Sequence, residues 1–425
     1  MNSPSSLNLL PALIIGLLSG NASAAGFQLL EQNASGLGNA YAGSAAVAEN
    51  ASTIFYNPAG MTQLKEREFS TGLVAVGTSF KFTDTGSSVG FLTGTGTGGN
   101  GGGWGFIPNA YLSWALNKDL YVGVGVGAPF GLKTEYDNPW VGAAQSAMFD
   151  VKTYNINPSV AFRVNDKVSV GAGLNWQRLT AQYIRQVAVV SAVTSASPLT
   201  LDLTGDSWGW NAGALFTVSP ASKVGVSYRS TVSYDLTGDI NITGPSAALN
   251  SSRSSGAKAS LKLPDVFVLS GTHQVSDKVQ LLGDISWTGW SSIPKLDVIR
   301  TSGALTGQIA QTLDTDFRDS TRVAAGVNYQ YRGDLKLKFG LAYDQTPVKG
   351  ASTRLVSLPD NDRTWLSAGA QWTVGKGGVM DIGATYLLLN NSQIDNNQLV
   401  DGRGRVTGEY SANAWIFGLQ YSRAF

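Results

Sequence analysis

The chain has 425 residues, 51 of them glycine and none cysteine, with a net charge of +1 at pH 7 and only 14% charged residues. A soluble protein of average composition has about 25% charged residues, whereas a membrane barrel has fewer because its outer wall faces lipid. The near-neutral charge indicates no nucleic-acid partner, and the lack of cysteine excludes disulfides, thiol catalysis and cysteine metal sites.

The first segment, residues 1–24, is predicted to be a secretory signal peptide. Residues 9–18 form a short apolar core, and Ala22, Ser23 and Ala24 supply the small residues that a signal peptidase requires. This core is too short to span a bilayer, which takes about 20 apolar residues. No later segment has the length and apolarity of a transmembrane helix. We expect cleavage after Ala24 and a mature chain that is either periplasmic or a barrel.

The next segment, residues 25–66, shows no sustained alternation and is dense in small side chains, above all between residues 34 and 46. Small side chains let backbone pack closely against a barrel wall. A 14-stranded barrel lies between the filled eight-stranded barrels and the open porins, so an empty lumen would leak. We therefore predict that residues 25–66 form an N-terminal hatch, or plug, inside the barrel formed by residues 67–425.

From residue 67 onward, apolar and polar residues alternate. Residues 335–343 are a clear example, and residues 168–176, 224–228 and 323–329 repeat the pattern. Successive side chains of a strand project to opposite faces, so each segment has one apolar and one polar face. A sandwich would alternate too, but short polar turns at one end and long Gly/Ser/Thr/Asn-rich loops at the other are typical of outer-membrane barrels.

The alternating runs number 14, an even number as in bacterial single-chain barrels. They are expected near residues 68–83, 106–116, 120–133, 150–164, 168–184, 206–219, 223–241, 257–275, 279–299, 316–331, 335–347, 363–374, 378–395 and 408–425. The predicted fold is thus all-β, a transmembrane 14-stranded antiparallel β-barrel with the hatch in its lumen. The chain ends on an aromatic residue, Phe425, which resembles the signal read by the barrel-assembly machinery.

The hatch contains three motifs, AGFQL at residues 25–29, SGLGNAYAG at 35–43 and ASTIFYNPAGM at 51–61. They resemble the hatch of the FadL/TodX family of outer-membrane long-chain fatty acid and hydrocarbon transport proteins. The similarity continues at residues 128–132, 155–159, 263–265 and 287–290. The resemblance implies loop capture of an apolar ligand, an internal pocket at the hatch N-terminus, and lateral release through the wall at a kinked third strand.

The implied ligand path joins the hatch N-terminus to the third strand. Glycines and a proline share one face of that strand, where they mark bends or close backbone approach. The alternatives are that these glycines only make room for the hatch, and that the hatch phenylalanine only packs the mature N-terminus. The path residues are Phe27, Gly123, Gly125, Gly127, Pro129 and Phe130.

The hatch motif residues carry no chemistry of their own. Proline fixes its own φ and restricts the residue before it, so the Asn-Pro-Ala triplet sets a turn. We interpret it as a structural hinge that bears on gating. The motif residues are Gly36, Gly38, Asn57, Pro58 and Ala59.

Two of the long loops have apolar content. The third, around residues 187–203, contains Val189, Val190, Leu199 and Leu201. Exposed apolar loops often mark binding sites, so we expect a capture groove there, shared with the loop at 242–256. The alternative is an extension of the flanking strands. In the fifth loop, leucine or isoleucine at 305, 309 and 313 predicts a short helix.

Ionisable residues are expected in the lumen by strand parity. They should pair with one another and with the hatch carboxylates Glu31 and Glu49, and one or two could hold a fatty acid carboxylate. These residues are Arg163, Arg229, Asp284, Arg322, Lys336, Lys338 and Asp381.

No catalytic, metal-binding or cofactor-binding residue is expected. His273 is the only histidine and lies near a periplasmic turn, away from any crevice, so serine–histidine catalysis is not favoured. The expected function is passive transport of long-chain fatty acids or similar hydrophobic compounds across the bacterial outer membrane, by a monomer in contact with outer-membrane lipid. The alternatives are an aromatic hydrocarbon channel, a general aqueous porin, and a surface receptor or adhesin.

Overall fold

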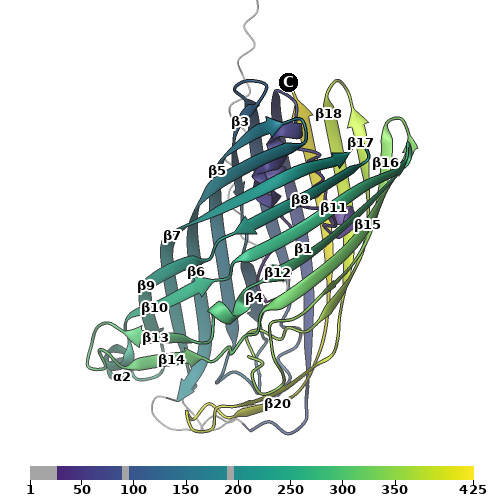
Figure 1. Cartoon of the computed structure of the whole chain (residues 1–425). Helices are drawn as coiled ribbons and strands as arrows, with labels where there is room; N and C mark the ends of the chain where they lie inside the picture. Colours follow the sequence, from purple (N-terminus) through teal and green to yellow (C-terminus); the bar gives the residue numbers. More distant parts are fainter. Residues whose placement is uncertain (1–25, 89–94, 189–195) are drawn as a thin grey trace, which may run out of the picture.

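The computed structural model describes residues 26–88, 95–188 and 196–425, and over these residues one antiparallel sheet closes on itself (Figure 1). The barrel closes because β1 pairs with β2 on one side and with the last strand, β20, on the other. The strands are β1 (Arg67–Asp84), β2 (Trp104–Ala115), β3 (Leu120–Gly127), β4 (Gly131–Glu135), β5 (Met148–Asn165), β6 (Val168–Ala188), β7 (Ala196–Ser219), β8 (Ser222–Arg229), β9 (Val232–Ile242), β10 (Ser255–Leu263), β11 (Val266–Ser276), β12 (Val279–Thr288), β13 (Leu296–Arg300), β14 (Ile309–Leu313), β15 (Ser320–Arg332), β16 (Leu335–Asp344), β17 (Arg363–Val374), β18 (Gly378–Leu389), β19 (Ser392–Asn397) and β20 (Arg405–Ala424).

We call each full-length strand of the barrel wall a stave. Six staves are interrupted once and therefore consist of two strands each, so the described strands make fourteen staves. The interrupted staves are β3/β4, β8/β9, β10/β11, β12/β13, β14/β15 and β18/β19. The predicted 14-stranded antiparallel barrel is confirmed. The predicted helix in the fifth loop is wrong, because residues 309–313 form β14 and pair with β13. A spacing of four keeps side chains on one face of a helix and also on one face of a strand, and here the strand pairing prevails.

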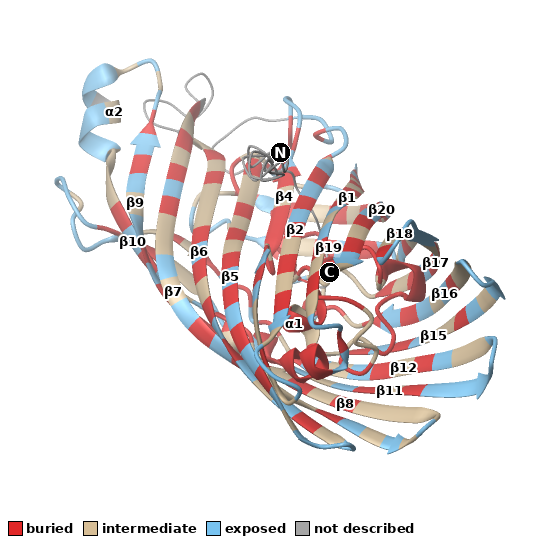
Figure 2. Cartoon of the chain, turned by 90° about the horizontal axis from the view of Figure 1, so that it is seen from above, coloured by how far each residue is buried: buried red, intermediate tan, exposed pale blue. Residues whose placement is uncertain are grey.

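The wall has two chemically different faces, and Figure 2 shows buried and exposed residues alternating along many of its strands. Large apolar side chains such as Leu174, Trp208 and Leu341 are exposed on the outer face. Inward neighbours such as Asn175 and Lys338 are buried, and Lys338 donates to Ser35 and Glu49 of the hatch. An apolar outer face is what a barrel presents to lipid. Among the described residues, no helix is long and apolar enough to cross a membrane.

The hatch fills the lumen with short helical turns, η1 (Leu37–Asn39), α1 (Thr53–Tyr56) and η2 (Pro58–Gln63) (Figure 2). Two more short helices lie elsewhere, α2 (Ala247–Arg253) in a long loop and η3 (Trp290–Ser292) in the wall. The predicted signal peptide, residues 1–24, and its cleavage site lie outside the described residues.

Inward-facing wall glycines let the hatch backbone dock directly on the strands. A Cβ added at Gly369 would lie 2.9 Å from the Cα of Gly38, and one at Gly418 would lie 2.7 Å from the Cβ of Ala34. Because real Cβ atoms essentially never come closer than 3.0 Å, any larger residue would displace the hatch. The other wall glycines in such contact with the hatch are Gly123, Gly127, Gly171, Gly213, Gly225, Gly340 and Gly383.

Candidate functional site

The third stave is kinked between β3 and β4. Gly127 pairs with Asn155 and Gly131 with Lys152 on the neighbouring β5. Three residues, 128–130, thus face two residues of β5, 153 and 154, so the third stave carries one extra residue at the kink. On the other side, β2 pairs with β3 only as far as Ala110 opposite Val126. Within the described part of the wall, no ladder pair joins residues 104–109 of β2 to β4. The hydrogen-bonded wall is therefore interrupted between β2 and β4.

The hatch N-terminus takes the place of β2 along the kink. The Gly131 amide donates to the Phe27 carbonyl, and the Leu29 amide donates to the Pro129 carbonyl, each at 2.8 Å. The Gln32 side chain accepts from the Ala128 amide at 3.0 Å and donates to its carbonyl at 2.7 Å. The free edge of the kinked stave is thus satisfied by residues 27–32, as a buried backbone requires.

The strand glycines also make room for the hatch. A Cβ at Gly123 would lie 2.7 Å from both Ile54 Cδ1 and Met61 Sδ of the hatch. One at Gly125 would instead meet the Tyr111 ring of the neighbouring β2 at 2.8 Å, with the hatch residue Ile54 at 3.4 Å. A Cβ at Gly127 would overlap the Gln32 side chain. The kink and the close hatch contact therefore occur together on β3, rather than excluding each other.

Phe27 lies in an aromatic pocket just inside the kink. Its ring centroid is 5.0 Å from that of Trp290 and 5.9 Å from that of Phe130. Trp290 is fully buried and reaches the pocket from η3. These rings belong to one buried apolar cluster that continues along the inner face of the wall through Leu132, Leu263 and other residues.

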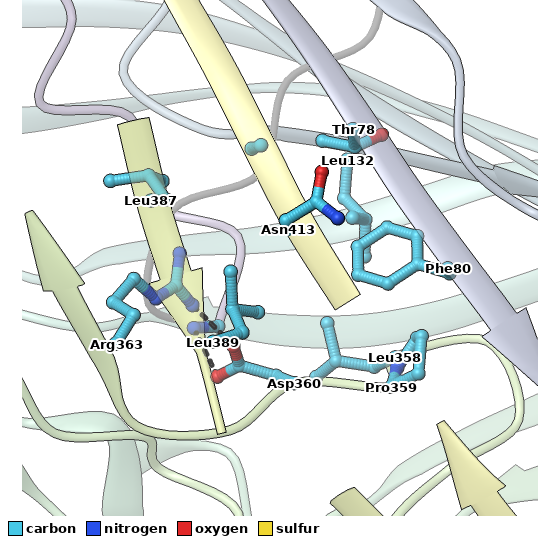
Figure 3. A pocket seen from close by; sticks show the side chains of 12 residues that line it. Thr78, Phe80, Leu132, Leu358, Pro359, Asp360, Arg363, Leu387, Leu389 and Asn413 are labelled. Atoms are coloured by element: carbon cyan, nitrogen blue, oxygen red, sulfur yellow. Dashed lines mark hydrogen bonds and ion pairs between the residues drawn. The ribbon is translucent and has the colours of Figure 1, made fainter. Parts of the chain in front are cut away.

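A buried ion pair anchors the first described residue beside this pocket. The Gly26 amide donates to Asp360 Oδ2 at 3.0 Å, and the Thr346 hydroxyl donates to the same oxygen at 2.6 Å. Arg363 donates to the other oxygen of Asp360. Figure 3 shows the side chains of Asp360 and Arg363 at one end of a pocket otherwise lined by Phe80, Leu132, Leu358 and other residues. This pocket has a volume of about 10 Å³, enough for about one water.

The remaining lumen charges hold the hatch to the wall. Glu49 accepts from Lys336 at 2.9 Å and from Lys338 at 2.8 Å, and Lys338 also lies 3.1 Å from Asp381. In the same way, Arg322 pairs with Asp284 at 3.6 Å and donates to the Ala40 carbonyl. Two further lumen arginines donate to hatch carbonyls, Arg163 to that of Thr62 and Arg229 to that of Phe55.

Glu31 behaves differently from Glu49. It is fully buried in the hatch, and both of its carboxylate oxygens are without a hydrogen-bond partner among the described residues. Burial raises the pKa of Glu31 from 4.5 to about 7, with Arg363 and Arg322 acting in the opposite direction. The predicted pairing of Glu31 with a lumen cation is absent as a direct contact.

The Asn-Pro-Ala turn joins the hatch to β7. Asn57 Nδ2 donates to the Ala45 carbonyl at 2.7 Å and to the Ala214 carbonyl at 3.0 Å, while Asn57 Oδ1 accepts from the Ala59 amide at 3.1 Å. Pro58 opens η2 directly after this cap. Of the motif glycines, Gly38 lies against Gly369, and a Cβ at Gly36 would lie 2.7 Å from the Tyr41 ring.

The predicted capture loop lies differently from expectation. Val189 and Val190 lie outside the described residues. Leu199 and Leu201 are in strand β7 rather than in a loop, and their buried side chains belong to the same apolar cluster as Phe27. For these two leucines the placement in an exposed loop is wrong. Their alternation with Thr200 and Asp202 extends the strand beyond its expected start.

His273 does have a serine neighbour. Its Nδ1 lies 2.8 Å from the hydroxyl of Ser222 across β8 and β11, at the end where tight turns join the strands. Both side chains are exposed. They lie at the opposite end of β11 from Val266, whose register partner Thr288 contacts Gln28 of the hatch. This pair contributes nothing to the candidate site.

A closed barrel with an apolar outer face, a docked hatch and an internal apolar pocket defines the class as outer-membrane transport channels. The model of the family described as "Outer membrane protein transport protein (OMPP1/FadL/TodX)" matches residues 15–425. The chain belongs to this family and is an outer-membrane protein.

Individual relatives agree with this assignment. The chain is 29% identical over 451 residues to the long-chain fatty acid transport protein of Escherichia coli O6:H1 (strain CFT073), an alignment covering 97% of each protein. Its fold matches the crystal structure of a Pseudomonas aeruginosa FadL homologue with a TM-score of 0.85 at 23% identity, covering 94% of this chain and 99% of the other. The P. putida toluene transporter TodX matches with a TM-score of 0.72 at 16% identity, covering 92% and 98%.

Proposed function

We propose that this protein is a passive outer-membrane channel, not an enzyme, and that its cargo is a long-chain fatty acid or a similar hydrophobic compound. The cargo binds in the pocket around Phe27 and leaves sideways into the membrane between β2 and β4. The observation that carries this proposal is the pairing of the kinked stave with hatch residues 27–32 in place of β2. Displacing these residues would open pocket and wall together.

The energetics favour an apolar route. Burying each methylene gains about 0.8 kcal/mol, so a 16-carbon chain gains about 12 kcal/mol on leaving water. A water-filled pore offers no such gain. The apolar cluster around Phe27 and Phe130 does, and through Phe130 and Leu132 it includes the kinked stave where the wall ladder is interrupted.

A fatty acid also needs a place for its carboxylate. Arg363 is buried at the end of the pocket in Figure 3 and is held by Asp360, which also binds the Gly26 amide. A ligand carboxylate that replaces Asp360 on Arg363 would loosen the anchor of the hatch N-terminus. Ligand binding and gate opening would then be coupled through one carboxylate.

An aromatic hydrocarbon is a second candidate cargo, favoured by the aromatic rings around Phe27. It carries no charge for Arg363 to bind. Palmitate and toluene uptake, compared in Arg363 variants, would separate the two cargoes.

The gate can be tested by a reversible lock, since the chain has no cysteine. Gln28 and Phe130 form an isolated antiparallel bridge, and directly opposite residues lie within the Cα separation of a disulfide. Because Phe130 itself lines the proposed pocket, the reference is the reduced form of the same double variant: cells carrying Gln28→Cys/Phe130→Cys should take up radiolabelled palmitate after reduction and not in the oxidised state. Ser222→Cys/His273→Cys, a register pair at the far end of the wall, is the control and should be insensitive to oxidation. Full uptake through the oxidised lock would refute the lateral route, and large stable currents in planar bilayers would instead favour an aqueous porin.

A further inference from the structure

The wall is interrupted at a second place, between β10 and β13. These strands pair only at Ala257 with Arg300 and at Lys258 with Ile299. The ladder resumes beyond the gap, where Val266 of β11 pairs with Thr288 of β12. Between these points residues 259–265 face the longer segment 289–298. The gap is crossed by the Gly289 amide, which donates to the Asp265 carbonyl at 3.0 Å, and by the Ser292 hydroxyl, which donates to the Lys262 carbonyl at 3.1 Å.

The longer segment folds into the lumen and fills the gap from inside. Trp290 and Ile293 are buried there. Trp290 is the same ring that contacts Phe27, and it also lies 5.9 Å from Phe317. The inner side of the second gap is therefore a wall of the proposed ligand pocket.

A groove of about 230 Å³ joins this gap to the outer surface. Its lining includes the exposed side chains of Ser260 and Lys262 together with Tyr234 and Ile293, which belong to the buried apolar cluster. Residues of both faces of the wall thus line one groove. Ser292 and Ile293, which line the groove, follow closely after Trp290 in the same segment.

The surroundings of the groove suit the head of an anionic amphiphile. Phe267 and Trp287 form a cross-strand pair next to the point where the ladder resumes, and both side chains are exposed on the lipid-facing side. Aromatic side chains of this kind mark the membrane–water interface. Lys262, Lys295 and Asp235 line the groove itself. Lys295 pairs with Asp297 at 2.8 Å and Asp235 accepts from the Ser260 hydroxyl, so Lys262 is the cation that would meet a carboxylate at headgroup depth while its alkyl chain points to the pocket.

We propose that residues 289–295 form a second gate, through which long-chain carboxylates exchange between the pocket around Phe27 and the outer headgroup region of the membrane. This inference rests on the proposed function, because it takes the pocket around Phe27 as the ligand site. Trp290 joins the two gates, since Phe27 packs on it from one side while η3 carries it from the other. A ligand that displaces Phe27 would loosen both.

The test uses single cysteines in the cysteine-free, full-length protein in vesicles of outer-membrane lipid. Ile293→Cys places a thiol at the inner side of the second gap, and Val298→Cys places a matched thiol in β13, where the native side chain is equally buried. With palmitate present, a lipid-soluble maleimide should label Ile293→Cys at least about tenfold faster, while Val298→Cys stays unchanged. Heat-modifiable gel mobility confirms that each variant is folded.

The outcomes separate the two proposals. Loosening of the contact between residues 28 and 130 by palmitate would be seen as slower formation of the Gln28→Cys/Phe130→Cys disulfide. If palmitate slows this reaction but leaves the labelling rate of Ile293→Cys unchanged, the second gate alone is overturned. Equal acceleration at Val298→Cys would also overturn it, because the whole wall would then be loosening. A protein that binds toluene but no palmitate would overturn this inference alone, because the second gate is proposed for long-chain carboxylates. A protein that binds neither would overturn the proposed function as well.

Discussion

Adding one methyl group at Gly340 should release the hatch from the wall. A Cβ there would overlap the carbonyl group of Asn39 and lie 2.5 Å from the amide nitrogen of Ala40. Both belong to the hatch backbone, so no flexible side chain can move aside. The Gly340→Ala variant must therefore shift the hatch, the strand, or both.

The cost follows from the contacts at that point. Overpacking of this kind costs about 1–3 kcal/mol. Asn39 also donates from its side chain to the carbonyls of Val327 and Phe339, each at 3.2 Å, and losing two such bonds costs about 2 kcal/mol more. A total of about 3–5 kcal/mol corresponds to a hundredfold to several-thousandfold weaker docking, roughly, since 1.4 kcal/mol is a factor of ten.

Hydrogen exchange of the hatch amides measures this directly. In Gly340→Ala, amides of residues 34–46 should exchange about a hundredfold faster or more, and planar bilayers should show intermittent ion currents. Gly271→Ala is the matched control, because the nearest atom to its added Cβ is 4.0 Å away. Native protection and silent bilayers for Gly340→Ala would refute the view that contact with wall glycines holds the hatch.

Further predictions concern the buried charges. Burial raises the pKa of Glu31 from 4.5 to about 7 in the folded state, so the folded state loses stability as the pH rises from about 4.5 to 7. Glu31→Gln should remove this pH dependence. At pH 8 it should raise the melting temperature, with a gain in the free energy of unfolding of up to about 3 kcal/mol. Lys338→Met leaves Asp381 and one oxygen of Glu49 without their shared cation and should cost about 3–5 kcal/mol in thermal unfolding at pH 7, a loss that Glu49→Gln in the same chain should reduce. Arg363→Leu should lower palmitate uptake at least about tenfold and leave toluene uptake unchanged, and an equal loss of both would indicate a purely structural role.

The barrel was predictable from sequence because lipid outside and hatch inside impose a period of two on each stave. The expected strand ends were too short where that contrast disappears. Residues 196–205 of β7 alternate buried leucines with polar side chains, but they extend beyond the apolar outer belt, so their outward residues resemble those of a loop. Without a lipid-facing row, the alternation does not distinguish strand from loop.

The candidate site was predictable only where it depends on local motifs. Phe27 and the glycines of β3 could be identified because the hatch motifs and the glycine-rich face are local in sequence. Asp360 and Arg363 could not, since the loop before β17 has no periodicity and nothing in it indicates that it folds back to Gly26. The contacts of Trp290 depend on η3, which turns into the lumen. The alternating pattern predicted one continuous strand over residues 279–299, so this turn could not be seen in the sequence.

The energetic contrast between the two ways out of the pocket favours the wall over the periplasm. Freeing residues 27–32 breaks four hydrogen bonds to the kinked stave and three more, which Tyr111, Tyr56 and Thr288 donate to the same segment. Together these cost about 7 kcal/mol at about 1 kcal/mol each. Moving the whole hatch would also separate Glu49 from its two lysines, at about 3–5 kcal/mol for each buried ion pair, and Arg322 from the Ala40 carbonyl, at about 2 kcal/mol. Every contact with the wall glycines would be lost as well. A 16-carbon ligand supplies about 12 kcal/mol by leaving water, part of which is spent ordering it. That supply suffices for the first rearrangement and not for the second, so the ligand moves the N-terminal residues and leaves the plug in place.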